Sequence, residues 1–275
     1  MRTAQARQIP PSYHRLPLRW ESLVLWMELV RNLATRDVEI RYKHSLLGLY
    51  WAILNPLITS AIFGFVFGVV LHASSKPIPY VVFLVAGLTF WNLFANAVVS
   101  ATGSVTGNAA LLAKVYFPRI ILPTAAVFAR IIDFGFSLVV FVLVDVVYRT
   151  PIHATAVFVL PLLLLEVLFA LGVGYIVAAL NVLYRDMSQL IGLVLMVWMY
   201  FSPVMYALSS LSSAVQTPLL VNPMGAMLEA QRDLIFLGHL TEPIYLWISV
   251  MWTLFTFVAG LALFKRVEPL FAEVM

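Results

Sequence analysis

Two ionisable side chains lie inside a long apolar stretch and are the first residues in this sequence to suggest a function. Arg130 and Asp133 are three positions apart, so on a helix they share a face and can form an ion pair. An ionisable residue in such surroundings is costly and marks either a transport path or a structural contact. We therefore predict an Arg130–Asp133 intramembrane pair, with helix packing and transport as the two interpretations.

Residue patterns typical of enzymes are missing from the sequence. Gly103 and Gly107 are not followed by Lys-Ser or Lys-Thr, as a phosphate-binding loop would require. The five histidines lie far apart, without metal-ligand spacing, and the chain has no cysteine. No GxSxG nucleophile elbow occurs. We therefore predict no catalytic, cofactor-binding or metal site in this chain, and we expect it to bind no ATP of its own.

The elements that position these residues must suit lipid rather than water. The 275 residues are 62% hydrophobic and 11% charged, with a mean hydropathy of +0.96. A soluble domain carries roughly a quarter charged residues. The apolar runs are continuous rather than alternating, which favours helices over barrel strands. The sequence predicts an all-α integral membrane protein.

We expect six transmembrane helices, each near the roughly 20 residues that cross a hydrocarbon core. The predicted spans are residues 46–71, 80–101, 123–148, 156–180, 188–206 and 244–264. Together, residues 46–264 form the transmembrane domain. Residues 1–45 are expected to be a cytoplasmic tail and an amphipathic interface helix, and residues 265–275 a cytoplasmic C-terminal tail.

Two segments outside these spans carry their own predictions. From residue 20 to about 43, apolar residues recur at helical spacing, which predicts an N-terminal amphipathic helix. It either lies along the membrane surface or packs only on its own protein. Residues 206–243 are too apolar for a free loop and too interrupted to span, so short re-entrant or interfacial helices are expected before the last span.

The positions of the basic residues predict the orientation. With six spans, thirteen of the 17 Lys and Arg residues fall on one side, and only Lys76, Arg149 and Arg232 fall on the other. Because basic loops stay in the cytoplasm, we expect both termini to be cytoplasmic. Asp145 and Glu166 then lie in the outer halves of their spans, where we expect water to reach them.

Aromatic residues crowd the end of the fifth predicted span. Trp198 and Phe201 share one helical face, whereas Tyr200 points about 100° away from Phe201. One interpretation is an aromatic belt at the membrane–water boundary. The other is a translocation path lined by flat aromatic surfaces. Tyr50 and Asn55 on the first span are the other predicted residues of this path.

The connection between the second and third spans is both apolar and basic. Its central residues are Lys114, Val115, Tyr116, Phe117, Pro118 and Arg119. Such a segment can dock a cytoplasmic partner. Without a partner, Tyr116 and Phe117 would dip into the membrane interface.

Several segments, in order along the chain, resemble one family. They are RDVEIRYK at 36–43, SLLGLYW at 45–51, LNP at 54–56, KVYFPR at 114–119, LP at 122–123, NVLYRD at 181–186, FSPV at 201–204 and NPM at 222–224. Together they are similar to the permease subunits of type-2 ABC exporters, closest to the bacterial exporters of polysaccharide, O-antigen and teichoic acid.

The resemblance implies a homodimer bound to two copies of a separate cytoplasmic ABC ATPase. ATP and Mg²⁺ would be bound by that partner, and this chain would hold no cofactor. With an ATPase as the cytoplasmic partner, residues 114–119 are predicted to be the ATPase-coupling site. The implied location is the plasma (inner) membrane of a bacterium, among membrane lipids, with no nucleic acid as a partner. Arg41, Tyr42, Leu47 and Gly48 are then expected where the substrate enters from the cytoplasm.

We therefore expect the permease subunit of an ATP-driven exporter that moves a lipid-linked cell-surface polysaccharide outward. Export of another amphiphile, such as a drug or lipid, is the alternative within this class. A stand-alone channel or an ion-coupled carrier is the alternative from a different class.

Overall fold

The described part of the chain is a bundle of helices. The computed structural model describes residues 20–42, 50–70, 72, 75, 77–112 and 117–271, and these contain no strand. The α-helices are α1 (Trp20–Tyr42), α2 (Tyr50–Phe63), α3 (Tyr80–Ser104), α4 (Ala109–Leu112), α5 (Ile121–Tyr148), α6 (Val159–Leu183), α7 (Met187–Tyr200), α8 (Ser213–Val221), α9 (Pro223–Arg232) and α10 (Pro243–Val267). The predicted all-α membrane class is confirmed.

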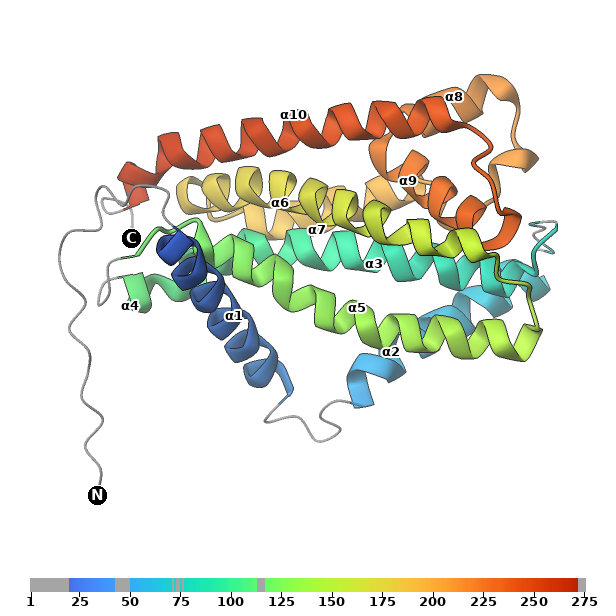
Figure 1. Ribbon diagram of the computed structural model, residues 1–275, viewed down its shortest axis with the longest axis horizontal. Helices are drawn as coiled ribbons and strands as arrows, with labels where there is room; N and C mark the ends of the chain where they lie inside the picture. The colour runs from blue at the N-terminus through green and yellow to red at the C-terminus, as the bar shows by residue number, and fades with distance from the viewer. Residues whose placement is uncertain are drawn as a thin grey trace.

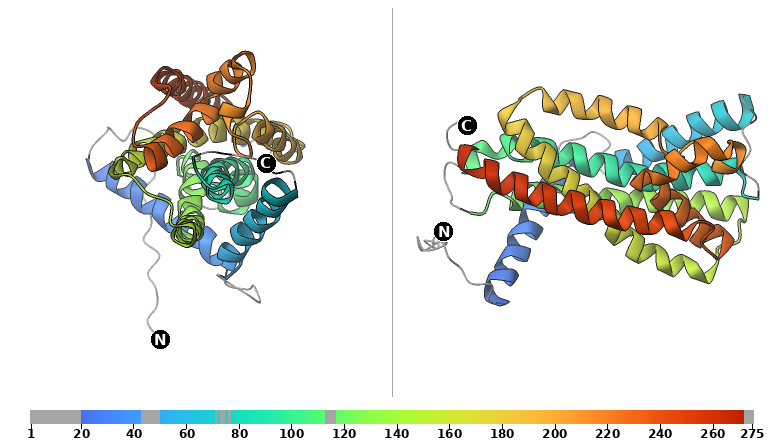
Figure 2. Two further views of the ribbon diagram at one scale, coloured as in Figure 1. Left: turned by 90° about the vertical axis from the view of Figure 1, so that its right-hand side faces the viewer. Right: turned by 90° about the horizontal axis from the view of Figure 1, so that it is seen from above.

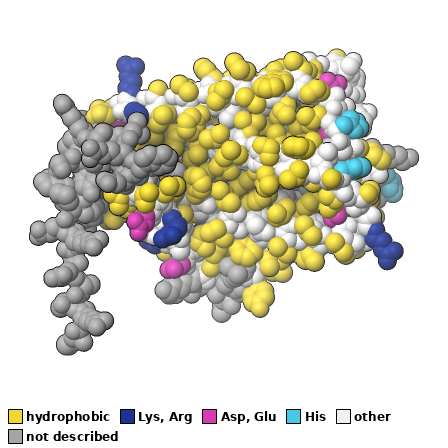
Figure 3. All heavy atoms as spheres, in the orientation of Figure 1, with side chains coloured by type: hydrophobic (Ala, Val, Ile, Leu, Met, Phe, Trp, Pro, Cys, Tyr) yellow, Lys and Arg dark blue, Asp and Glu magenta, His cyan; other side chains and the backbone are white. Residues whose placement is uncertain are grey.

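Five helical segments are long and apolar enough to cross a membrane. They are Ile53–Val70, Tyr80–Ser104, Ile121–Tyr148, Ala154–Leu183 and Pro243–Leu270. The first joins α2 to a π-helical turn at Gly64–Val70, and the fourth adds a 3₁₀ turn at Ala154–Phe158 to α6. Apolar side chains cover the middle of the bundle, and the charged groups lie toward its two ends (Figure 3). This pattern suits a protein whose mid-section faces lipid.

The fifth predicted span differs from the observed helix. We expected residues 188–206, whereas α7 is a 14-residue helix that ends at Tyr200. The physical reason lies in the sequence after it, since a residue that precedes proline disfavours the α conformation and Ser202 precedes Pro203. The chain therefore turns over residues 201–206 instead of continuing as a helix.

Helix α3 lies at the centre of the bundle, as the end-on view shows (Figure 2, left). Of its spanning window 78% is buried, against 11% for α2 and 17% for α10. Aromatic packing contributes to this core: the rings of Phe94 and Phe169 stack with centroids 5.3 Å apart, and Trp198 meets both edge-on. Helices α2 and α10 leave most of their apolar surface uncovered in the single chain.

Helix α1 crosses one end of the bundle, and α8 and α9 lie at the opposite end (Figure 1). The second half of α1 packs on α5, where Ala34 meets Ala125 and Ala129. The first half exposes Val24 and Met27. The second half of α1 therefore packs on its own protein, and the membrane-surface interpretation of the first half stays a prediction.

Helices α8 and α9 fill the predicted interrupted segment, and α9 is packed into the bundle. Its residues Met224, Met227 and Leu228 are fully buried. The side chain of Asn222 caps the helix by accepting a hydrogen bond from the backbone N–H of Met224 at 3.1 Å. A buried α9 lets polar residues from this segment reach the bundle interior.

Candidate functional site

Asp133 on α5 is the hub of a polar cluster that ties α1 to the bundle. Its Oδ2 accepts a hydrogen bond from Arg130 Nη1 at 2.9 Å and another from Arg41 Nη1. Its Oδ1 accepts a hydrogen bond from the Tyr42 hydroxyl at 2.8 Å. Arg130 Nε also donates to Ser100 Oγ on α3 at 2.5 Å. We call these five residues the anchor cluster.

The anchor cluster unites two groups of residues that the sequence singled out separately. Arg130 and Asp133 were predicted as an intramembrane pair, and Arg41 and Tyr42 as part of a substrate entrance. The structure places all four together, across 91 and 92 positions of the chain. Leu47 and Gly48, the other predicted entrance residues, lie outside the described residues.

A cavity of about 270 Å³ adjoins the anchor cluster. It lies between α1, α3 and α5, and its lining includes Arg41, Arg130, Asp37 and Asn108. Burial and the hydrogen bond to Asp133 raise the pKa of Tyr42 to about 12, so its hydroxyl remains a neutral donor at physiological pH. Asp133 is shared between Arg41 and Arg130, and Asp37 pairs with Arg36 at 3.4 Å, so these three guanidinium groups and two carboxylates leave one net positive charge. The cavity can therefore attract an anionic group.

Asn222 is the centre of a second polar arrangement, at the end of α7. Its Oδ1 accepts a hydrogen bond from Trp198 Nε1, and its Nδ2 donates to Phe201 O and Ser202 Oγ, each at 2.9 Å. With the N–H of Met224 on the same Oδ1, one side chain joins the end of α7 to the start of α9. Trp198 is thus half-buried and held in place.

Trp198 and Phe201 line one apolar groove, which we call the α7 groove. It holds about 620 Å³ between α6, α7, α8 and α10, and Tyr200 is not among its lining residues. The predicted path residues Tyr50 and Asn55 are exposed on α2, which packs on α3 and α5. Within one chain, then, the four predicted path residues form two separate pairs rather than a continuous path.

The predicted ATPase-coupling segment is described only from Phe117 onward. Lys114, Val115 and Tyr116 lie outside the described residues, and Phe117, Pro118 and Arg119 are half-buried. The Arg119 guanidinium donates to the backbone oxygen of Glu268 at 2.8 Å and lies 5.7 Å from the ring centre of Phe271. Arg119 therefore fixes this segment to the end of α10.

Buried polar groups near α9 were not predicted from the sequence. Arg232 was counted as an outer loop cation, but its side chain is buried and hydrogen-bonded to the backbone oxygens of Pro203 and Val204. Glu166, which we expected water to reach, is fully buried and accepts a hydrogen bond from Gln231 at 2.7 Å. Asp145 is buried as well. The expectation that water reaches Glu166 and Asp145 was wrong, and for Glu166 the reason is that Gln231 of α9 packs directly against it.

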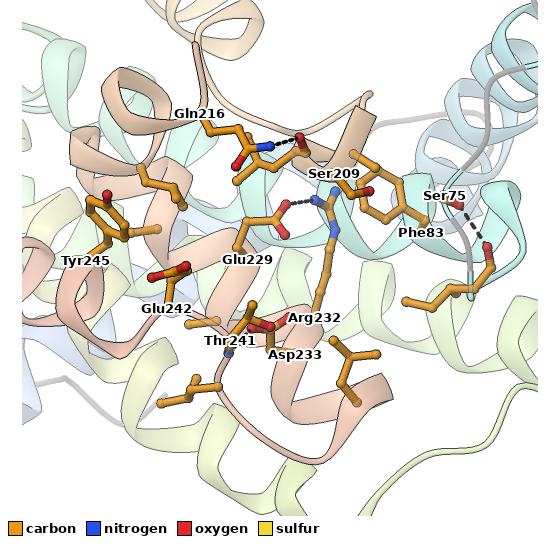
Figure 4. Close-up of a pocket in the computed structure, with 18 of the residues that line it drawn as sticks. Ser75, Phe83, Ser209, Gln216, Glu229, Arg232, Asp233, Thr241, Glu242 and Tyr245 are labelled. Atoms are coloured by element: carbon orange, nitrogen blue, oxygen red, sulfur yellow. Dashed lines mark hydrogen bonds and ion pairs between the residues drawn. The ribbon is translucent and has the colours of Figure 1, made fainter. Parts of the chain in front are cut away.

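One feature of the sequence could have revealed the burial of Arg232: an acidic residue, Glu229, lies three positions before it, at helical spacing. Glu229 Oε1 accepts a hydrogen bond from Arg232 Nη1 at 3.0 Å (Figure 4). Burial raises the pKa of Glu229, and the nearby guanidinium partly offsets that rise. An acid and a base three positions apart in an apolar segment thus indicated an internal pair.

The sequence is similar to known membrane transport proteins over most of its length. Residues 28–236 match the family model described as ABC-2 type transporter. The O-antigen export system permease protein RfbA of Klebsiella pneumoniae is 31% identical over 252 residues, which cover 90% of this chain and 95% of the relative. The polysialic acid transport protein KpsM of Escherichia coli is 27% identical, covering 87% of this chain and 93% of the relative. The capsule polysaccharide export inner-membrane protein CtrC of Neisseria meningitidis serogroup B is 24% identical, covering 91% and 96%.

The anchor cluster predicts a specific effect of one substitution. Asp133→Asn should weaken the docking of α1 on the bundle by about 2 kcal/mol of free energy, a value between those for exposed and buried ion pairs. The reason is that two guanidinium groups would face each other without a full counter-charge. Hydrogen–deuterium exchange of residues 33–42 in the purified full chain measures this loosening. Asp37→Asn is the control, since among the described residues the Asp37 carboxylate is paired with Arg36 of its own helix, at 3.4 Å, and with no residue of α5. Equal exchange in the two variants would contradict the anchoring role.

Proposed function

Because the chain belongs to the ABC-2 type transporter family, we propose that it is the membrane-spanning permease subunit of an ATP-driven exporter of a lipid-linked cell-surface polysaccharide. The observation that carries this proposal is its similarity to an O-antigen export permease over 90% of its length. The capsule and polysialic acid relatives also favour a glycan over a drug. The absence of a phosphate-binding loop from the sequence supports an ATPase in a separate subunit.

We propose six spans with both termini in the cytoplasm of a bacterium. The spans would be α2 with its π-helical turn, α3, α5, α6, α7 and α10. Because α7 has only 14 residues, the turn at residues 201–206 and the adjoining α8 and α9 would complete its outer half. The proposed orientation is supported by the excess of Lys and Arg in the sequence segments that six spans would leave on the side of the two termini.

Cysteine labelling tests this orientation, because the chain has no native cysteine. Arg185→Cys, after α6, should resist an impermeant thiol reagent applied to spheroplasts, whereas Ser212→Cys, before α8, should react. Both positions are exposed, so a difference reports the side of the membrane rather than burial. Labelling of Arg185→Cys from outside would overturn the six-span topology.

The proposed partners are a second copy of this chain and two copies of a cytoplasmic ATPase that binds ATP and Mg²⁺. Residues 114–119 would dock the ATPase, and the hydrogen bonds of Arg119 to Glu268 would hold that segment in position. The uncovered apolar face of α2 suits burial against a second copy or lipid. Energy from ATP hydrolysis would then reach the bundle through this connection.

Truncating the docking side chains tests the coupling role. Tyr116→Ala combined with Phe117→Ala should reduce the ATPase recovered with the purified permease by tenfold or more, since a docking anchor is worth about 2 kcal/mol or more. The matched control is Lys265→Ala with Arg266→Ala, two exposed residues in the last turn of α10. Undiminished recovery with the aromatic variant, at normal permease levels, would exclude this docking site.

At the cytoplasmic end, the cavity beside the anchor cluster would receive the anionic phosphate of the lipid carrier. Arg41 and Arg130 line it, and Tyr42 adds a neutral hydroxyl next to it. Leu47 and Gly48 would belong to the same entrance. The glycan would then pass along aromatic surfaces, with Trp198 and Phe201 on α7, and Tyr50 and Asn55 contributed by α2.

Export measured in cells tests the function and the path together. Cells without this chain should lack the surface glycan, and the wild-type chain should restore it only with an active partner ATPase. Phe201→Ala should lower surface glycan several-fold, because one aromatic contact is worth about 1 kcal/mol. Tyr200→Ala should have little effect, although Phe201 and Tyr200 are similarly exposed, at 63% and 56%. Surface glycan that persists without the chain would refute the function, and equal export by both variants would refute the path.

A further inference from the structure

A second cavity lies at the opposite end of the bundle from the anchor cluster. It holds about 360 Å³, within the range of small-molecule sites, and we call it the outer pocket. Its walls come from the loop between α2 and α3, the start of α3, and the segment from residue 207 to residue 245. Figure 4 shows side chains from α8, α9 and the start of α10 converging on this space.

Arg232 gives one wall of the outer pocket a fixed shape. Its guanidinium lies 3.6 Å from the ring centre of Phe83 and is hydrogen-bonded to Pro203 O, Val204 O and Glu229. Gly87 leaves the space that the Arg232 guanidinium occupies. A Cβ atom at position 87 would lie 3.1 Å from Arg232 Cζ. The side chain is 2% exposed, and its Nε has no hydrogen-bond partner among the described residues. This wall of the pocket is therefore fixed in shape by contacts within the protein.

The remaining polar groups of the pocket are mostly acceptors. Glu229, Asp233 and Glu242 contribute three carboxylates, against the single cation of Arg232. Asp233 accepts the backbone N–H of Thr241 at 2.7 Å. The Glu242 carboxylate and the Tyr245 hydroxyl make no hydrogen bond with the other described side chains. This surplus of carboxylates disfavours an anionic ligand.

The arrangement also disfavours a metal ion. Among the described residues, no group of three or more His, Cys, Asp or Glu side chains is placed to hold one. Dispersed carboxylates are instead suited to several hydroxyl groups on one ligand, since an O–H donating to a carboxylate makes a strong hydrogen bond. The half-buried ring of Tyr245 adds a flat apolar face. A polyhydroxylated ring with apolar C–H faces matches both features.

We propose that the outer pocket binds an uncharged sugar residue of the exported glycan as it leaves the membrane. Glu242 and Tyr245 bind hydroxyl groups of the sugar, and Glu229 and Arg232 form the rigid wall against which it rests. The site holds the glycan on the outer side after it has passed the spans. This inference rests on the proposed function, from which the cargo and the orientation are taken.

Protection of a single introduced cysteine tests the location of binding. The probe is a lipid-free oligosaccharide released from the cell's own surface polysaccharide by mild acid, added to the purified permease–ATPase complex. It should slow alkylation of Ser209→Cys, which lines the pocket, and leave Ser213→Cys, an exposed α8 residue outside the lining, unchanged. No protection, or equal protection at both positions, would overturn the proposal. Protection by Mg²⁺ or Ca²⁺ alone would overturn it in favour of a cation site.

A charge substitution tests the chemistry of binding. Glu242→Gln should raise the oligosaccharide concentration needed for half-protection about tenfold, because a hydrogen bond to a charged group is replaced by a weaker neutral one. Glu28→Gln, an exposed carboxylate on α1, should not change it. An unchanged half-protection concentration in Glu242→Gln would remove Glu242 from the site. If the oligosaccharide does not protect the pocket but wild-type cells still export glycan, the outer pocket is not a sugar site and the proposed function still holds.

Discussion

Every charge within this apolar bundle must find its partner inside the protein, because lipid offers none. The chain meets this requirement at two places. At one end, Asp133 takes donors from Arg41, Tyr42 and Arg130. At the other, the two terminal nitrogens of Arg232 donate to two backbone oxygens and Glu229. The first contact positions α1, and the second joins α9 to the end of α7, so both ends of the molecule depend on internal charge pairing.

Helix α3 connects these two arrangements. Ser100 on α3 accepts a hydrogen bond from Arg130, and Gly87 of the same helix leaves the space occupied by the Arg232 guanidinium. Thirteen residues of helix separate them, or about 20 Å at a rise of 1.5 Å per residue. Since α3 is the most buried of the long helices, it can transmit a displacement between the two ends with little internal deformation. In the proposed exporter, a change at the ATPase end would reach the outer pocket through this helix.

The sequence predicted the class of fold because lipid demands long apolar stretches, and these are visible without any alignment. It could not reveal that Arg41 and Tyr42 share a carboxylate with Arg130, since that contact depends on how α1 crosses α5, some 90 positions away. The burial of Arg232 was missed for a related reason. Its acceptors are the carbonyls of Pro203 and Val204, which follow the end of α7 at Tyr200 and lie 29 and 28 positions away. Local periodicity carries neither piece of information.

The two cavities differ in charge, and this difference suits a cargo with one anionic end. In the proposed exporter, the cavity lined by Arg41 and Arg130 attracts the phosphate of the lipid carrier, whereas the carboxylates of the outer pocket repel it. An uncharged sugar residue experiences the opposite preference, because carboxylates accept hydrogen bonds from its hydroxyl groups. The electrostatic pattern therefore favours one arrangement of the cargo, with the phosphate retained at the cytoplasmic end while the glycan advances outward. A neutral amphiphile without a phosphate would gain nothing from the first site, which gives a physical reason for a lipid-linked glycan as the substrate.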